Sequence, residues 1–593
     1  MRTILALSLA VVFTASGQPA AQKPEVPEGY WPLAKSEEIL KKTETIRLAP
    51  DLSSLTPAER SALTDLLEVG SMLQKLYEEQ KHHQALYSLD RLRVLDVQLG
   101  QPKLTQNLLQ LYRLNQGPIA STLTNEREAF LPVSHQIPGR NVYPLDATKD
   151  EIETFLAAHP ERRAEILDER SVVRRATKSN IDKDLQILRV YAELRALHPF
   201  AQLKLQNVQR LATPNAFYAT PYAIAYADQL VPAYRLLMKA AETIDASDNE
   251  FARYLRNRAR DLLTNDYESG DASWITGRFK RFNAQIGAYE TYDDAMYGVK
   301  AFHGMSVLLT NQQATEELRK ALGGLQAIED ALPYANHKRV REDLPVGVYD
   351  VIADFGQARG TNTATILPND PLFSRRYGRT IMLRENIMKN PEIFAADQRV
   401  WRAATVEAHA NDLAAEGNFQ RTLWHEIGHY LGPDRDKQGR TLDVALEDYA
   451  DAVEEMKSDL VSLFALHRMN HPSLRAIQSS GIRRTLQNVK PRRDQPYQTM
   501  QLIQFNWFVA NGLLQPDPKT ARLKVNYERY PEVVTSLLTE VLRLQAEGDK
   551  AATAAFFDKW TQWTPEVHDK LAARIRDAQG ARFRIVRYAA LGE

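Results

Sequence analysis

The chain has 593 residues, contains no cysteine, and carries 75 Lys and Arg residues against 75 Asp and Glu residues. Because the formal charge is zero, there is no strong basic field, and nucleic acids and anionic membrane surfaces are disfavoured as partners. The absence of cysteine excludes disulfides, a thiol nucleophile and a cysteine-ligated metal. A chain of this length provides core for two or more domain-sized units.

The first stretch of the chain has the pattern of a secretory signal peptide. Arg2 precedes an apolar run from Thr3 to Ala15, and small residues at Ala15–Gly17 or at Pro19–Ala21 offer a cleavage site. The apolar run is too short to remain as a membrane span. We therefore expect residues 1–21 to be removed and the protein to be exported to the periplasm, with no stable membrane insertion.

Helices are predicted for most of the first half of the chain. Thr56 and Glu59 have the spacing of a capping box, with Pro57 at the first helical position. Leucines at helical spacing follow and indicate a face that packs on the core. We expect His82 and His83, at the end of this pattern, to lie on the surface.

The pattern changes between residues 332 and 385. Val346–Ala353 and Thr380–Leu383 are rich in β-branched residues, with turn residues between them. Helical patterns then return and continue to the region of residue 579. The predicted fold is therefore mainly α with a β-rich part, of the α+β class.

One short motif suggests a metal site. His425 and His429 are four residues apart on a predicted helix that would end at Gly432, so both imidazoles can meet one ion. Glu426 would then stand beside the metal, where it can accept a proton from water. The alternative is a helix with two surface histidines, but only 13 histidines occur in the chain, so a chance match is uncommon.

A second helix offers the third ligand that a zinc site needs. Between Ala452 and Phe464 apolar residues keep helical spacing, and Glu454, Glu455 and Asp459 lie beside that stripe. The alternative for such acids is a solvated helix face. We predict one Zn²⁺ per chain, held by His425, His429 and Glu455 in a thermolysin-type arrangement, with Glu454 and Asp459 as candidates for orienting the imidazoles.

Together these motifs resemble the dipeptidyl peptidase III family of zinc metallopeptidases, in particular its branch with a five-residue zinc motif, which is similar to the Nudix-fused plant members. Further segments agree with the family in the same order: Ile286–Lys300, Ile366–Asp370, Ile381–Asn386, Thr499–Gln501 and Tyr527–Asp549.

The resemblance implies two lobes that face each other across a cleft. One would be a helical lobe that carries zinc, and the other would have a small β-barrel core. The domain prediction is a first lobe at 22–310, a catalytic lobe at 311–550, and a C-terminal helical segment at 551–593. The β-rich segment at 332–385 would pack on the first lobe.

The resemblance also implies roles for residues outside the metal motif. Tyr292 would donate a hydrogen bond to the developing oxyanion, and Glu290 and Asn369 would bind the free amine of a peptide. Two positions depart from the family: Ile366 replaces an asparagine, and Thr499 replaces a histidine.

The function predicted from the sequence is zinc-dependent hydrolysis of short peptides with release of N-terminal dipeptides, with Glu426 as the base and Tyr292 assisting. Two alternatives stay open, namely an oligopeptidase that cuts internally and a non-catalytic zinc-containing protein that binds peptides. The oligomeric state is not predicted.

Overall fold

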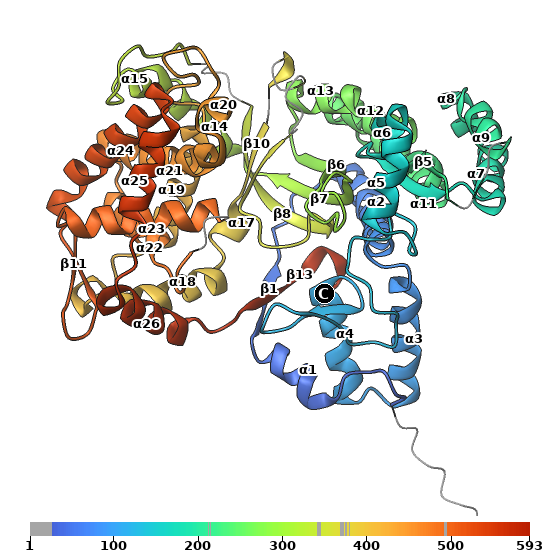
Figure 1. Cartoon of the computed structure of the whole chain (residues 1–593), viewed down its shortest axis with the longest axis horizontal. Helices are drawn as coiled ribbons and strands as arrows, with labels where there is room; N and C mark the ends of the chain where they lie inside the picture. The colour runs from blue at the N-terminus through green and yellow to red at the C-terminus, as the bar shows by residue number, and fades with distance from the viewer. Residues whose placement is uncertain are drawn as a thin grey trace, which may run out of the picture.

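The computed structural model describes residues 26–210, 213, 215–340, 345–367, 373, 376–378, 380–491 and 495–593. The predicted signal peptide and Asn369 lie outside these residues. The described chain is mainly helical around one larger sheet, so the predicted α+β class is confirmed. In Figure 1 a group of helices from the second half of the chain lies on one side of this sheet, and the N-terminal helices lie on the other side and below.

Helices of eight or more residues account for most of both halves. Before the main sheet they are α1 (Leu33–Leu40), α2 (Pro57–Lys81), α3 (Ala85–Gln98), α4 (Lys103–Asn115), α5 (Lys149–Ala158), α7 (Lys178–Val190), α9 (Ala201–Arg210), α11 (Ala227–Ile244), α12 (Asn249–Thr264) and α13 (Glu268–Thr276). After residue 310 they are α14 (Gln312–Leu322), α18 (Pro391–Ala404), α19 (Ala415–Gly428), α21 (Ala450–Arg468), α22 (Leu474–Thr485), α23 (Pro496–Ala510), α24 (Tyr530–Glu547), α25 (Lys550–Trp560) and α26 (Lys570–Ala578).

The main sheet has five strands in the order β6-β7-β8-β10-β9. The strands are β6 (Phe282–Glu290), β7 (Phe302–Thr310), β8 (Val346–Gly356), β9 (Ala364–Leu367) and β10 (Thr380–Arg384). Only the β8–β10 pair is parallel; the other three pairs are antiparallel. In the described part of the chain β6 and β9 are the edges of this sheet, so the small β-barrel core that the resemblance implied is not shown by the described residues.

This sheet separates two hydrophobic cores. In β10, Ile381 and Leu383 pack with the helices of the second half, whereas Met382 between them packs with the N-terminal helices. Successive side chains of a strand point to opposite faces, so one strand contributes to both cores. The predicted β-rich segment thus joins the two helical halves through its pairing with β7, while the predicted boundary at residue 310 stays a prediction.

The capping box predicted at the start of α2 is confirmed. The Thr56 hydroxyl accepts a hydrogen bond from the Glu59 N–H, and the Glu59 carboxylate accepts one from the Thr56 N–H. The surface prediction for His82 is wrong, because this side chain is 1% exposed and its Nε2 lies 3.1 Å from the Ser134 carbonyl oxygen. Its backbone is extended just after α2 ends, so the spacing of helix faces no longer decides where the ring points.

The end of the chain differs from its prediction. In the segment 551–593 the last α-helix ends at Ala578, and β13 (Phe583–Tyr588) then pairs in parallel with β1 (Thr43–Leu48) near the N-terminus. A single 3₁₀ turn, Ala589–Leu591, follows β13. Apolar residues and arginines alternate over most of β13. In a segment of only six residues this alternation is weak evidence for a strand, so the sequence did not predict it. This pairing brings the last residues of the chain to α4 and β8 (Figure 1).

Candidate metal centre

The two histidines and the predicted third ligand come from two helices in direct contact. α19 carries His425, and His429 is the residue that caps its C-terminal end, while Glu455 lies on α21. The helix ends at Gly428 rather than at the predicted Gly432, but His429 keeps helical backbone angles, so the two rings remain one turn apart.

A glycine allows the two helices to approach closely. A Cβ atom added at Gly428 would lie 2.8 Å from the Ser458 carbonyl oxygen on α21. Since real Cβ atoms do not come so close to backbone, a larger residue here would push α21 and its glutamates away from the histidines. Gly428 therefore sets the distance between the donor groups.

The three predicted ligands form a compact donor set. One donor atom each from His425, His429 and Glu455 all lie within 4.8 Å of one another. The His425 Nε2 is 3.1 Å and the His429 Nε2 is 3.8 Å from a Glu455 oxygen. Ligands of a tetrahedral zinc ion, each about 2.1 Å from it, lie about 3.4 Å apart, so these distances fit.

The Glu455 carboxylate is a direct indication that an ion fits here. Its Oε2 atom is buried and lies 3.1 Å from the His425 Nε2. When His425 donates its Nδ1–H to Asp459, its Nε2 carries a lone pair, so two buried acceptors face each other, and a cation between the three donors would satisfy both. The residues present therefore fit a zinc ion.

The outer nitrogens of both rings face carboxylates. The His425 Nδ1 lies 2.8 Å from Asp459, and the His429 Nδ1 lies 2.9 Å from Glu454 and 2.9 Å from the Ser458 hydroxyl. A ring that donates its Nδ1–H to a carboxylate keeps the lone pair of Nε2 for a metal. Both imidazoles are thus oriented with Nε2 toward Glu455.

Asp459 is held by two arginines. Arg421 from α19 and Arg484 from α22 lie 3.3 and 2.9 Å from its carboxylate oxygens. Burial alone would raise the pKa of Asp459, but the charges of Arg484 and His425 outweigh it and hold the pKa well below its usual value. Burial in turn favours neutral His425, but the Asp459 carboxylate prevails and raises the pKa of that ring.

Glu454 is held by a buried lysine and an amide. The Lys457 ammonium lies 2.7 Å from its carboxylate and also donates to the carbonyl oxygens of Gly428 and Leu431 at the end of α19. Gln545 from α24 donates to the second carboxylate oxygen at 3.0 Å. Burial raises the pKa of Glu454, but the Lys457 charge and the His429 hydrogen bond outweigh it, and the pKa falls to about 2.

Glu426 is placed differently from the other acids. It follows His425 on α19, is partly exposed, and has no hydrogen bond or ion pair with a described residue.

A tyrosine also contacts the metal centre. The Tyr497 hydroxyl at the start of α23 donates to the Glu455 Oε1 at 3.1 Å, and the side chain is half exposed. Burial and then the Glu455 charge raise the pKa of Tyr497 to about 12, so it remains a neutral donor.

Two of the residues predicted outside the metal motif, Glu290 and Tyr292, belong to the main sheet and to the segment that follows β6. Glu290 ends β6, and Tyr292 stands two residues later in an irregular segment, with 69% of its surface exposed. None of the hydrogen bonds and ion pairs between described residues joins Tyr292 to the metal centre.

The segment that carries Tyr292 is nevertheless firmly held. Asp293 accepts hydrogen bonds from the Tyr77 hydroxyl at 3.0 Å and the Gln357 amide at 2.8 Å. Asp294 accepts one from the Tyr143 hydroxyl at 2.7 Å and others from backbone N–H groups between residues 296 and 300. The exposed ring of Tyr292 therefore projects from a fixed support.

The structure adds residues that the sequence reading did not single out. They are Arg421, Gly428, Lys457, Arg484, Tyr497, Gln545 and Gln504, whose amide donates to Asp459 at 3.3 Å. Gly428 lies between the two histidines and Lys457 between Glu454 and Asp459, so both could have been suspected from their positions. Arg421 stands one helical turn before His425, but nothing in the sequence indicates its partner, and the others are distant in sequence and carry no local signal.

No helix in the described part of the chain is both long enough and apolar enough to cross a membrane.

No protein-family model matches the chain. Among curated proteins, Nudix hydrolase 3 of Arabidopsis thaliana is 23% identical over 564 residues, which cover 88% of this chain and 70% of the plant protein.

Solved structures match over almost the whole chain. DPP III from Caldithrix abyssi has a TM-score of 0.78 at 22% identity and covers 94% of this chain and 99% of its own. Dipeptidyl-peptidase III from Corallococcus sp. strain EGB has a TM-score of 0.70 at 22% identity, with 95% and 98% covered. The resemblance predicted from the sequence is thus confirmed for the fold.

Proposed function

We propose that this chain, which has the dipeptidyl-peptidase III fold, is a zinc-dependent peptidase that acts on short peptides. The observation that carries the proposal is the compact donor set of His425, His429 and Glu455, with a partly exposed Glu426 beside it. A purely structural zinc site has four protein ligands, whereas three ligands and an adjacent base are typical of hydrolytic sites.

The chemistry divides between the ion and the side chains. When bound, zinc would supply a Lewis acid and lower the pKa of a water molecule to about 7. Glu426 accepts a proton from the attacking water and delivers it to the leaving amine. Glu426 suits this role because no described side chain holds its carboxylate.

Tyr292 is proposed to donate a hydrogen bond to the oxyanion that develops on the peptide carbonyl. Its exposed ring on a fixed segment supports this role, since a donor must reach the substrate without reorganising its support. Tyr497 lies on the metal side and is a second phenol near the reacting atoms.

The site of cleavage depends on how the peptide amine is held. Glu290 and Asn369 are proposed to bind a protonated N-terminus, a charge-assisted contact worth about 1.5–3 kcal/mol. An amine anchored at a fixed distance from the metal would place the second peptide bond over it, so that dipeptides are released. Ile366 replaces the asparagine of the resembled family and removes one amide from this anchor.

The test is mass spectrometry of digests of matched peptides with a free or an acetylated N-terminus. Release of N-terminal dipeptides, slowed about tenfold or more by acetylation, is the expected result, because each 1.4 kcal/mol is a factor of ten. Equal cleavage of both peptides at internal bonds would contradict dipeptide release and would show that the protein is an oligopeptidase that cuts internally. Zinc binding without cleavage of any peptide would favour the non-catalytic alternative.

We also propose that the protein acts after export to the periplasm, on the basis of the signal-peptide pattern in residues 1–21. N-terminal sequencing of the protein from its native host is expected to begin after this segment. A native protein that starts at Met1 would contradict export.

A further inference from the structure

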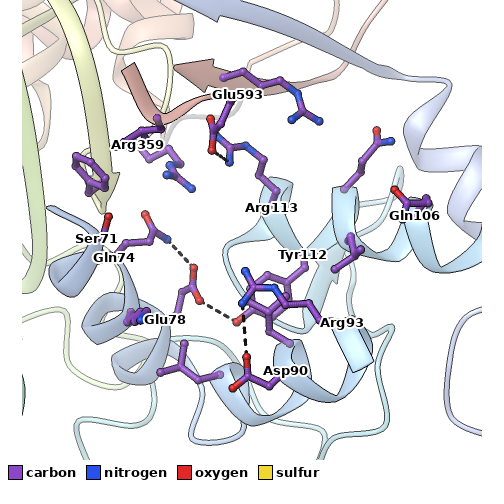
Figure 2. A pocket seen from close by; sticks show the side chains of 18 residues that line it. Ser71, Gln74, Glu78, Asp90, Arg93, Gln106, Tyr112, Arg113, Arg359 and Glu593 are labelled. Carbon is purple, nitrogen blue, oxygen red and sulfur yellow. Dashed lines mark hydrogen bonds and ion pairs between the residues drawn. The ribbon is translucent and has the colours of Figure 1, made fainter. Parts of the chain in front are cut away.

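A cavity lies apart from the metal centre, where three N-terminal helices meet the sheet. Its volume is about 670 Å³, within the range of small-molecule sites. Residues of α2, α3 and α4 form one side, and the residues after β8 together with the end of the chain form the other (Figure 2). None of its lining residues belongs to the metal centre.

One wall of this cavity presents a buried carboxylate. Glu78 on α2 is 6% exposed and accepts hydrogen bonds from the Gln74 amide at 2.7 Å and the Tyr112 hydroxyl at 2.9 Å. Both donors are neutral, and no ion pair joins Glu78 to a cation among the described residues. Burial raises the pKa of Glu78, although the two hydrogen bonds lower it in part.

The opposite wall presents a guanidinium. Figure 2 shows the Arg359 side chain directed into the cavity from the end of β8, across from Gln74 and Glu78. Its Nε atom donates to the Asp354 carbonyl oxygen at 3.3 Å, and no carboxylate of the described residues lies within ion-pair distance. Burial and the neighbouring charge of Arg113 lower the pKa of Arg359, although Tyr588, Glu593 and Glu78 act in the opposite direction.

Four of the other charged residues around the cavity are paired with one another. Arg113 forms a bidentate ion pair with Glu593, and Arg93 lies 3.5 Å from Asp90 at the exposed rim. Lys75 and Arg587 also line the cavity and have no ion pair among the described residues, whereas Glu78 is the one acid of the lining without such a pair. Glu78 and Arg359 are thus an opposite pair that sense each other's charge across the cavity but do not meet. Two such groups are left for a ligand to bridge.

We propose that this cavity binds a short zwitterion, such as a free dipeptide, with its ammonium on Glu78 and its carboxylate on Arg359. Arginine binds a carboxylate through paired N–H donors, and each Glu78 oxygen keeps acceptor capacity for an ammonium. Two residues of extended chain span about 7 Å, longer than a direct ion pair and suited to groups that face each other across a gap. Leu86, Leu89 and Leu109 line the same cavity and offer apolar contact to side chains.

The test is isothermal titration of the full chain with glycylleucine, N-acetylglycylleucine and glycylleucine amide. It is run in wild-type protein and again in the His429→Ala, Glu290→Gln double variant, in which neither the metal ligands nor the proposed amine anchor of the active site is complete. Glycylleucine is expected to bind in both proteins, and removal of either terminal charge is expected to weaken binding at least tenfold.

Variants connect the binding to the cavity. Arg359→Gln and Glu78→Gln are expected to weaken glycylleucine binding at least tenfold in the His429→Ala, Glu290→Gln background, whereas Arg93→Gln at the rim leaves it unchanged. Equal loss in Arg93→Gln, equal binding of the blocked probes, or no binding of glycylleucine would overturn the proposal. Should Glu78→Gln fail to fold, the N-acetylated probe gives the same test on the intact chain.

Discussion

The metal centre and the Tyr292 segment hold their functional side chains in different ways. In the metal centre every buried acid outside the ligand set has a cation or an amide against it, and the ligands come from two packed helices. In the Tyr292 segment the support is fixed by Asp293 and Asp294, while the tyrosine itself is exposed.

The two regions differ in whether their functional side chains are already oriented before a substrate binds. The metal ligands are oriented in the free protein, because carboxylates already hold the outer nitrogen of each ring. Tyr292 has a fixed base and no described partner in the metal centre, so its contribution must arise with the substrate present. Variants on the two sides should therefore affect metal binding and turnover separately.

The largest effect is expected for His429→Ala. Loss of one of three ligands should remove most of the zinc and reduce peptide hydrolysis to background, which metal analysis and a peptide assay measure together. His83→Ala, at an exposed histidine on the other side of the molecule, is the matched control and should keep both. Full zinc occupancy in His429→Ala would rule out this ligand set.

Tyr292→Phe should change turnover and leave the metal in place. Removal of one oxyanion donor costs about 10²–10³-fold in kcat in hydrolytic enzymes, and a loss at the lower end is expected here. Tyr297→Phe in the same segment is the control, since its hydroxyl contacts the Lys149 carbonyl oxygen and Glu153, neither of which belongs to the metal centre. Normal turnover in Tyr292→Phe would transfer the donor role to another group, with Tyr497 the first candidate.

Asp459→Asn should act on the metal rather than on the substrate. Loss of the carboxylate behind His425 should weaken zinc binding by about 10–100-fold, as measured by competition with a chelator. Asp451→Asn, at an exposed position near the start of α21, provides the control. If the two variants bound zinc equally well, Asp459 would not orient the ligand.

Sequence reasoning reached the metal centre because its signals are local. His425 and His429 share a helix face by spacing alone, and Glu455 lies on a strongly amphipathic segment whose buried stripe is confirmed at Val453, Met456 and Leu460. The sheet was found only in part, since β8 and β10 have clear β patterns but their order depends on pairing between distant segments.

The other features of the site and of the fold depend on contacts between segments that are distant in sequence, and no local sequence pattern predicts such contacts. Arg421 and Arg484 look like ordinary surface arginines in the sequence, and only the packing of α19, α21 and α22 brings them to Asp459. The same holds for Arg359 and Glu78, which lie 281 positions apart (359 − 78) and face one cavity. Short strands such as β13 are also missed, because a parallel partner at the other end of the chain decides their structure.

The central claim is that zinc sits on His425, His429 and Glu455 while Glu426 moves the proton. The most direct measurement is zinc content together with kcat for Glu426→Gln, which keeps the shape of the side chain and removes the base. Full zinc occupancy with kcat reduced by about 10²–10⁴-fold or more is the predicted result. Loss of zinc would make Glu426 a ligand, and near-normal kcat with zinc in place would show that another group is the base.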